Sequence, residues 1–367
     1  SRDRLKVMPL GEAEKYLKTE EGKLYLNKIG ERSFLDYTKF TISGEKSDYY
    51  EDFFQGATVV PRDLWFVTIV DASDPKFVVV KSRGKVKVSI GPLQVEREFI
   101  YGVLTSAEVV PFCHLPPKPA VLPIRPVEGG YQLVTRELCQ QDKPFLAKWL
   151  EEAESLWAQI RSERQRETSV YEWLNYRGKL TRQDPGRRLK IVYVRSGTNL
   201  VATVVEEKHY ELEVEKGKVV INHTIIDNTL YFHQTNSEDE ADYLTAVFNS
   251  SVLNKLVKPL QTRGFSERDF HKKPLEFPIP RFNPSDPIHK KLSDLGKNAR
   301  SKVCKDLENI LKKLGYYNKV VNFKPLTENQ VGKLRKEVRN SISDLLAMID
   351  ESTEKLLLTS VQVGKGT

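Results

Sequence analysis

The sequence predicts an α+β fold, in which antiparallel β-rich recognition domains with interspersed helices precede a pair of long antiparallel helices at the C-terminal end. Three observations predict it: short β-branched runs separated by turn residues, apolar residues at helical spacing between them, and two long apolar stripes near the end. With 367 residues, the chain is long enough for two or three domains. We divide it into 1–130, 131–284 and 285–367.

The sequence has two β-rich parts, one near its start and one in its middle. Runs rich in Val, Ile and Phe occupy residues 57–60, 64–70, 77–80 and 86–90, and Pro or Gly separates them, as in antiparallel strands joined by tight turns. Residues 115–130 are rich in proline and end in two glycines, which predicts a linker. A second β-rich block covers residues 190–230.

Helix starts are marked by capping residues. Pro144 opens a helix whose stripe includes Trp149 and Ala153, and residues 237–240 form a capping box before another helix. Residues 286–287 start a helix that ends at Gly315, and residues 327–330 cap a second one whose apolar stripe reaches residue 349. Two long amphipathic helices with a short connection normally pack antiparallel.

Charge and cysteine content limit the class of protein. Lys and Arg number 58 against 50 Asp and Glu, a net charge of +8, which favours polyanionic partners, nucleic acid before a membrane surface. No apolar run of membrane-spanning length and no signal pattern occurs, so we expect a cytoplasmic chain without a membrane partner. The three cysteines lie far apart without a CxxC pair, which favours neither zinc nor redox chemistry and is typical of a reducing cytoplasm.

Motifs of catalysis are missing from the sequence. There is no Gly-rich nucleotide turn and no Asn/Asp-Pro-Pro-aromatic tetrapeptide; residues 283–286 and 115–118 resemble the tetrapeptide only in part and indicate turns. Asp184 followed by Glu206-Glu207-Lys208 fits a nuclease motif loosely, as charged triplets often do. We therefore predict no catalytic, cofactor-binding or metal residue here. A self-contained enzyme with an unrecognised site and a subunit-docking module remain the alternatives.

Three segments combine cations with amides or aromatic residues, a composition that suits contacts to phosphates and base edges. Amides interleaved with cations predict base contacts in the second segment, and the purely cationic first segment predicts phosphate contacts. The candidate DNA-binding residues are Arg62; Arg83, Lys85 and Lys87 in the first segment; Asn175, Arg177, Lys179, Arg182 and Gln183 in the second; Asn199; and Arg263, Arg268, His271, Lys272 and Lys273 in the third.

An ordered series of motifs resembles a known family. It comprises residues 54–64 (FQGATVVPRDL), 174–183 (LNYRGKLTRQ), 192–202 (VYVRSGTNLVA), 240–250 (EADYLTAVFNS) and 263–280. These residues resemble the C-terminal target-recognition region of large prokaryotic N6-adenine DNA methyltransferases, of the type IIG or type I-like restriction–modification and phage-defence systems. The resemblance covers roughly residues 50–300.

The resemblance implies sequence-specific recognition of double-stranded DNA. In that family a separate N-terminal domain, or a separate catalytic subunit, holds S-adenosylmethionine and methylates adenine. That domain is absent from this chain, so we expect no cofactor and no methylation by this chain alone, with S-adenosylmethionine bound by the parent enzyme. The C-terminal helical pair resembles the spacer helices of type I specificity subunits.

Overall fold

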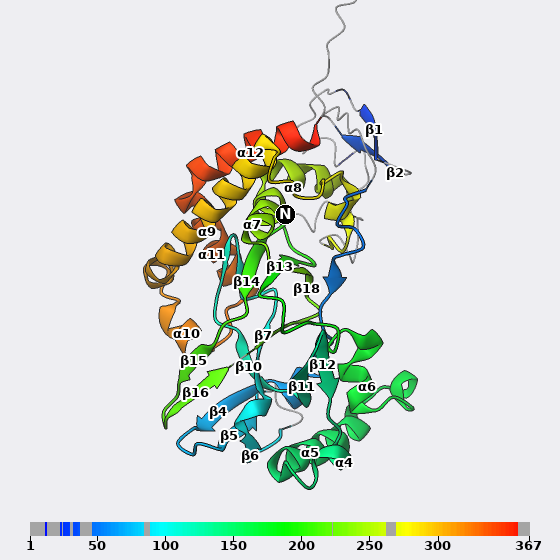
Figure 1. Ribbon diagram of the computed structural model, residues 1–367, viewed down its shortest axis with the longest axis vertical. Helices are drawn as coiled ribbons and strands as arrows, with labels where there is room; N and C mark the ends of the chain where they lie inside the picture. The colour runs from blue at the N-terminus through cyan, green and yellow to red at the C-terminus, as the bar shows by residue number, and fades with distance from the viewer. Residues whose placement is uncertain are drawn as a thin grey trace, which may run out of the picture.

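A computed structural model describes residues 12, 23, 25–29, 32–36, 46–83, 89–221, 223–261 and 269–358, and it confirms the α+β class (Figure 1). Helices α8, α9 and α12 lie at one end of the molecule, strands β4–β6 and helices α4–α6 at the other, with β13, β14 and β18 between them. Among the described residues, no helix combines the length and the apolar character needed to cross a bilayer.

The central sheet has the strand order β14-β13-β18-β3, all antiparallel. Its strands are β3 (Phe54–Gln55), β13 (Leu189–Val194), β14 (Ala202–Glu206) and β18 (Leu230–Thr235). All six residues of β13 are buried, because α7 (Glu238–Asn249) packs on β13 and β14. Helix α9 (Pro287–Lys313) in turn packs on α7, so the sheet is covered by two layers of helix.

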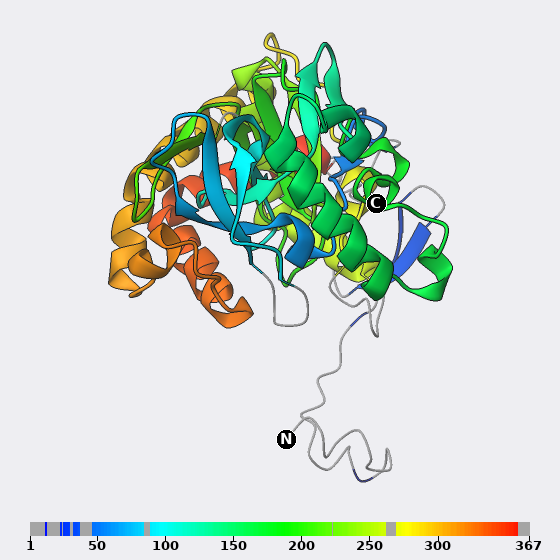
Figure 2. The same cartoon turned by 90° about the horizontal axis from the view of Figure 1, so that it is seen from below.

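The β-rich end contains two three-stranded sheets. One is β4 (Val67–Asp71), β5 (Phe77–Ser82) and β6 (Leu93–Glu96); the other has the order β10-β7-β17, with β7 (Ile100–Leu104), β10 (Lys118–Val121) and β17 (Thr224–Ile226). Helix α5 (Pro144–Ile160) lies against these strands (Figure 2). The Glu96 carboxylate of β6 accepts hydrogen bonds from the backbone of Phe145 and Leu146, and so caps α5.

The elements not yet named, apart from the C-terminal helices α11 and α12, are all short. They are β1 (Tyr25–Ile29), β2 (Arg32–Asp36), α3 (Arg62–Trp65), η2 (Arg97–Phe99), β8 (Val109–Val110), β9 (Cys113–His114), β11 (Ile124–Val127), β12 (Gly130–Leu133), α4 (Arg136–Cys139), η3 (Glu163–Gln165), α6 (Val170–Leu174), η4 (Tyr176–Gly178), β15 (Tyr210–Glu213), β16 (Lys218–Ile221), α8 (Ser251–Val257), η5 (Lys258–Leu260), η6 (Lys273–Glu276) and α10 (Tyr317–Val321).

The predicted C-terminal helical pair is present, but its second member is broken. Helix α9 begins at the Asp286 cap, and α11 (Glu328–Ser341) begins with the predicted capping box of Thr327 and Gln330. The chain leaves helical geometry at Ile342 (φ −124°, ψ 23°), and α12 (Ser343–Leu357) follows. The Ser341 hydroxyl donates to the Val338 carbonyl, a local bond of the kind that competes with the helical backbone.

The proline-rich residues 115–130 form strands, so the predicted linker was wrong. Strand β10 lies at the edge of the β10-β7-β17 sheet, a position where proline is tolerated, and its other side forms only an isolated bridge between Ala120 and Phe66. Ala120, Val121 and Ile124 are completely buried. The apolar run at residues 64–70 is likewise partly helical, because α3 occupies its start.

Two hydrophobic cores hold the molecule together. The first joins the central sheet to α7–α9, α11 and α12, and it also contains residues such as Phe53 and Val109 from the N-terminal third. The second joins β4–β7, β10, α5 and α6 to Ile221 and Ile225 from the middle of the chain. The first core thus contains residues from all three predicted parts of the chain, and the second core contains residues from the first two. The division at residues 130 and 284 stays a prediction about folding units.

Cys113 and Cys304 form a disulfide that links β9 to α9 across 191 residues of sequence, while Cys139 is free and buried. The cysteine spacing did not indicate this bridge, and the cysteine count was typical of a reducing cytoplasm, in which such a pair would be open.

Candidate nucleic-acid interface

The turn after α6 is shaped by two of the predicted amides. The Asn175 side-chain oxygen accepts hydrogen bonds from the backbone of Leu180 and Thr181, at 3.2 and 3.1 Å. The Gln183 side chain is completely buried, and its amide both donates to and accepts from the Ile226 backbone, at 2.9 and 2.8 Å. Gln183 therefore cannot reach a base edge as predicted, and the carbonyl group of Asn175 is already engaged in holding the turn.

The cations of the same turn project around two exposed aromatic rings. Arg177 (φ 57°) and Lys179 lie over the Tyr176 ring, at 5.2 and 5.9 Å, and Arg182 lies over the Phe54 ring at 5.5 Å. Phe54 and Tyr176 are 41% and 39% exposed, and Lys179 donates to the Gln55 side chain at 2.7 Å. We name residues 54, 55, 176, 177, 179 and 182 the Tyr176 surface.

A further cation reaches this surface from the end of β13. Burial lowers the pKa of Lys179, and the positive charges of Arg177, Arg182 and Arg195 lower it further. The charge of Arg195 also opposes the rise that burial causes in the pKa of Tyr231. The Tyr231 ring lies edge-on to the His271 ring, with 6.4 Å between the ring centroids. The second and third predicted segments are thereby brought close together.

The other residues of the third segment have structural partners. Lys272 donates to the Tyr50 carbonyl at 2.6 Å, and Lys273 donates to the Asp269 carbonyl at 2.9 Å. His271 (φ 46°) lies 3.4 Å from the Asp269 carboxylate and is exposed. Of this segment, His271 is the described residue best placed for an outside ligand, while Arg263 and Arg268 lie outside the described residues.

The remaining candidates are dispersed. Arg62 lies 3.8 Å from the buried Asp227 carboxylate, and Asn199 accepts from the Asn254 side chain at 3.2 Å. Arg83 is half-buried, and burial lowers its pKa. Its backbone N–H donates to the Phe66 carbonyl in the β-rich end of the molecule. Lys85 and Lys87 lie outside the described residues, so the predicted phosphate-binding hairpin stays a prediction.

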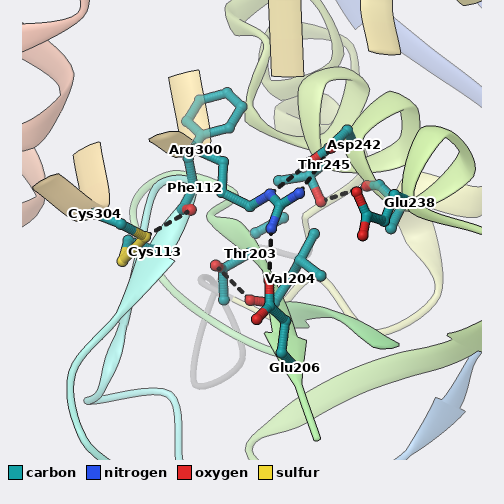
Figure 3. Close-up of polar contacts among 12 residues, drawn as sticks. Phe112, Cys113, Thr203, Val204, Glu206, Glu238, Asp242, Thr245, Arg300 and Cys304 are labelled. Carbon is teal, nitrogen blue, oxygen red and sulfur yellow. Dashed lines mark hydrogen bonds and ion pairs between the residues drawn. A yellow bond between two sulfur atoms is a disulfide. The ribbon is translucent and has the colours of Figure 1, made fainter. Parts of the chain in front are cut away.

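The loosely nuclease-like residues do not form a metal site in the structure. Glu206 pairs with Arg300, which also binds Asp242 (Figure 3), whereas Glu207 pairs with the buried Lys190. Asp184 lies 3.7 Å from Arg187. Within the part of the chain that the structure describes, no cluster of three His, Cys, Asp or Glu side chains could hold a metal ion.

Two features of the surface were missed from the sequence. Phe54 and Gln55 are contributed by β3, which joins the sheet beside β18, more than 170 residues away. Beside them lies a hollow of about 490 Å³, lined by Asp52, Phe54, Arg182, His233 and Gln234. The pairing of β3 with β18 has no local signal in the sequence, although Phe54, Gln55 and Arg195 all stand within motifs that carry the family resemblance.

No protein-family model matches the chain, and no curated protein sequence matches it either. Among solved structures, a similar chain is that of the type IIL restriction–modification enzyme MmeI in complex with DNA. The alignment has 8% sequence identity and a TM-score of 0.39, and it covers 92% of this chain but only 42% of that one. This chain thus spans less than half the length of that enzyme.

Proposed function

We propose that this chain recognises double-stranded DNA sequence-specifically, as the target-recognition region of an adenine-N6 methyltransferase from a restriction–modification or phage-defence system. The observation that carries the proposal is the Tyr176 surface. Within the described residues, Arg177, Lys179 and Arg182 have no carboxylate within 4.0 Å, although most other cations near them are paired. Unneutralised cations around exposed rings favour a polyanionic, aromatic ligand, which nucleic acid provides.

The side chains of the surface suit different contacts. Arg177 is exposed on a turn, and its guanidinium can bind a guanine edge through two hydrogen bonds. Lys179 and Arg182 are held by Gln55 and by the backbone of Gly178 and Arg177, so they present fixed charges that suit phosphates. In this proposal Arg177 selects sequence, and the other two cations position the duplex.

Methylation in this proposal is performed outside the chain. The partner is an N-terminal methyltransferase domain of the same polypeptide or a separate catalytic subunit, which holds S-adenosylmethionine. The family resemblance of residues 50–300 supports this division, and so does the absence of Gly-rich and Asn-Pro-Pro-aromatic motifs from the sequence. A cytoplasmic location follows from that role.

Salt-dependent binding to labelled duplexes tests the proposal. We expect the logarithm of the binding constant to fall with the logarithm of salt concentration, by about 0.9 for each phosphate contact, and Arg182→Ala to reduce that slope by about one. Arg177→Ala should relax preference at one or two base pairs, by roughly 1–3 kcal/mol. Lys148→Ala, an exposed change on α5, is the matched control. Binding that is flat in salt, or that these variants leave unchanged, would reject duplex recognition by this surface.

A further inference from the structure

A deep cleft lies between α11 and the turn that follows β13. Its volume is about 700 Å³, within the usual range of ligand sites. One wall is formed by Arg335, Lys336, Arg339 and Asn340 of α11. The opposite wall carries the small polar residues Ser106, Ser196, Gly197, Thr198 and Asn199, and Glu328 is the one carboxylate among the lining residues.

The two arginines are fixed in place by backbone carbonyls. Arg335 donates to the Val109 and Ser106 carbonyls, and Arg339 donates to the Asn249 carbonyl at 3.1 Å. A guanidinium has five N–H donors, so each arginine keeps donors beyond these contacts. These contacts fix both guanidinium groups before a ligand binds, so little side-chain entropy would be lost on binding.

The three cations of the cleft lack acidic partners. In the described parts of the chain, no carboxylate lies within 4.0 Å of Arg335, Lys336 or Arg339. The acids whose charges act on the two arginines have other partners: Glu108 pairs with Lys118 at 2.6 Å, and Asp350 accepts from the Ser251 backbone and hydroxyl. Burial lowers the pKa of Arg335 to about 10 and lowers that of Arg339, and the charges of Glu108 and Asp350 offset this effect only in part.

Two other cations in the described chain, the buried Lys190 and the half-buried Arg300, do have acidic partners. Lys190 pairs with Glu207, and Arg300 pairs with Asp242 and Glu206. Buried charges in proteins are normally paired or bound to a ligand. A charge-compensating anion is therefore what the cleft lacks.

We propose that the α11 cleft is a binding site for a phosphate group. Arg and Lys bind phosphate oxygens through charge-assisted hydrogen bonds, and the hydroxyl and amide groups of the opposite wall suit the remaining oxygens. The space exceeds that of one phosphate, so the group belongs either to a free nucleotide or to a nucleic-acid backbone. The site is distinct from the Tyr176 surface, and its existence does not depend on the function proposed there.

Calorimetric titration of the whole chain with inorganic phosphate and with a deoxynucleoside 5′-monophosphate, and anisotropy with a short labelled DNA duplex, test the site. Lys336 is exposed, so Lys336→Gln should leave the fold intact. Arg339→Gln removes a half-buried cation, and Lys333→Gln on the exposed side of α11 is the charge-matched control. We expect Lys336→Gln and Arg339→Gln to weaken binding of the phosphate source about tenfold or more, equivalent to ~1.4 kcal/mol, and Lys333→Gln to leave it unchanged.

The arms of the experiment separate the sources of the phosphate. Binding of phosphate or mononucleotide that depends on Lys336 assigns a free ligand, and duplex binding alone that depends on Lys336 assigns a backbone phosphate. If the two cleft variants match Lys333→Gln in every arm, or if acetate competes as well as phosphate, the inference is wrong. Duplex binding that depends on Arg182 but not on Lys336 or Arg339, with no phosphate binding, would reject the cleft and leave the proposed function standing.

Discussion

Arg300 shows how one side chain joins elements that are distant in sequence. It projects from α9 and donates to both oxygens of Asp242 on α7, at 2.8 and 3.0 Å, and to Glu206 on β14 at 2.8 Å (Figure 3). The Asp242 side chain is only 1% exposed. Burial raises the pKa of Asp242, and the hydrogen bonds and charge of Arg300 oppose that rise. Arg300 thus stabilises the charged form of a buried carboxylate.

Arg300→Met should lower the free energy of unfolding by about 3–5 kcal/mol at neutral pH, because it leaves the Asp242 charge buried without a partner. The folded-state pKa of Asp242 then rises further above its unfolded value. The loss is therefore fully present above that folded pKa and shrinks as the pH falls through it, where Asp242 takes up a proton. Denaturant unfolding over a pH series measures this.

The matched control is Lys302→Met, an exposed change on the same helix. Adding Asp242→Asn to Arg300→Met should recover much of the lost stability, since it removes the unpaired charge. A loss that is the same at every pH, and that Asp242→Asn does not relieve, would show that Arg300 acts through packing alone.

Residue-scale roles could be predicted from the sequence only in part. The basic turn at residues 175–183 was found, and Arg177, Lys179 and Arg182 do lie together around Tyr176. The role of Gln183 was missed, because its burial depends on Ile226 in β17, 43 residues away. An amide beside cations has the same local pattern whether it faces solvent or a distant strand.

At the scale of elements, the contact between α7 and α9 depends on a glycine. A Cβ added to Gly296 would lie 2.2 Å from the Asp242 carbonyl oxygen, which belongs to the α7 backbone. The absence of a side chain lets the two helices approach closely at this point. In α11, by contrast, a Cβ on Gly332 would meet nothing within 4 Å.

The two glycines should respond in opposite directions to the same change. Gly296→Ala should lower the free energy of unfolding by about 1–3 kcal/mol, because overpacking forces α7 and α9 apart. Gly332→Ala should raise it by roughly 0.5–1 kcal/mol, because alanine favours the helix and meets no obstacle. Chemical denaturation of both variants measures the difference. Similar effects of the two changes would mean that the helices are not in close contact at Gly296.

Elements with local signals were predicted well, and elements set by distant partners were not. The caps at Ser237, Asp286 and Thr327 each lie within three residues of the backbone groups that they satisfy, and all three are present. The cap of α5 is Glu96, almost fifty residues away, and nothing near Pro144 indicates it. Strand β10 in the proline-rich segment also lacks a local signal, because its partner is β7.

Over the whole molecule, the chain crosses repeatedly between its two cores. Strand β17 leaves the second core after pairing in parallel with β7, and β18 then enters the central sheet beside β3. The Cys113–Cys304 disulfide fastens a hairpin from the N-terminal third to the first C-terminal helix within the first core. Such a bridge restricts the unfolded chain strongly, because it closes a long loop.

Cys304→Ser should therefore lower the free energy of unfolding under oxidising conditions. For a loop of 191 residues the chain-entropy relation gives about 5 kcal/mol as an upper value. In a reducing buffer the wild-type protein and the variant should unfold at nearly the same denaturant concentration, because neither then has the bridge. Alkylation of the denatured, oxidised wild type should label Cys139 alone, and prior reduction should expose all three thiols. If the stability difference persisted in reducing buffer, Cys304 would act through its packing on β9 and not through the bridge.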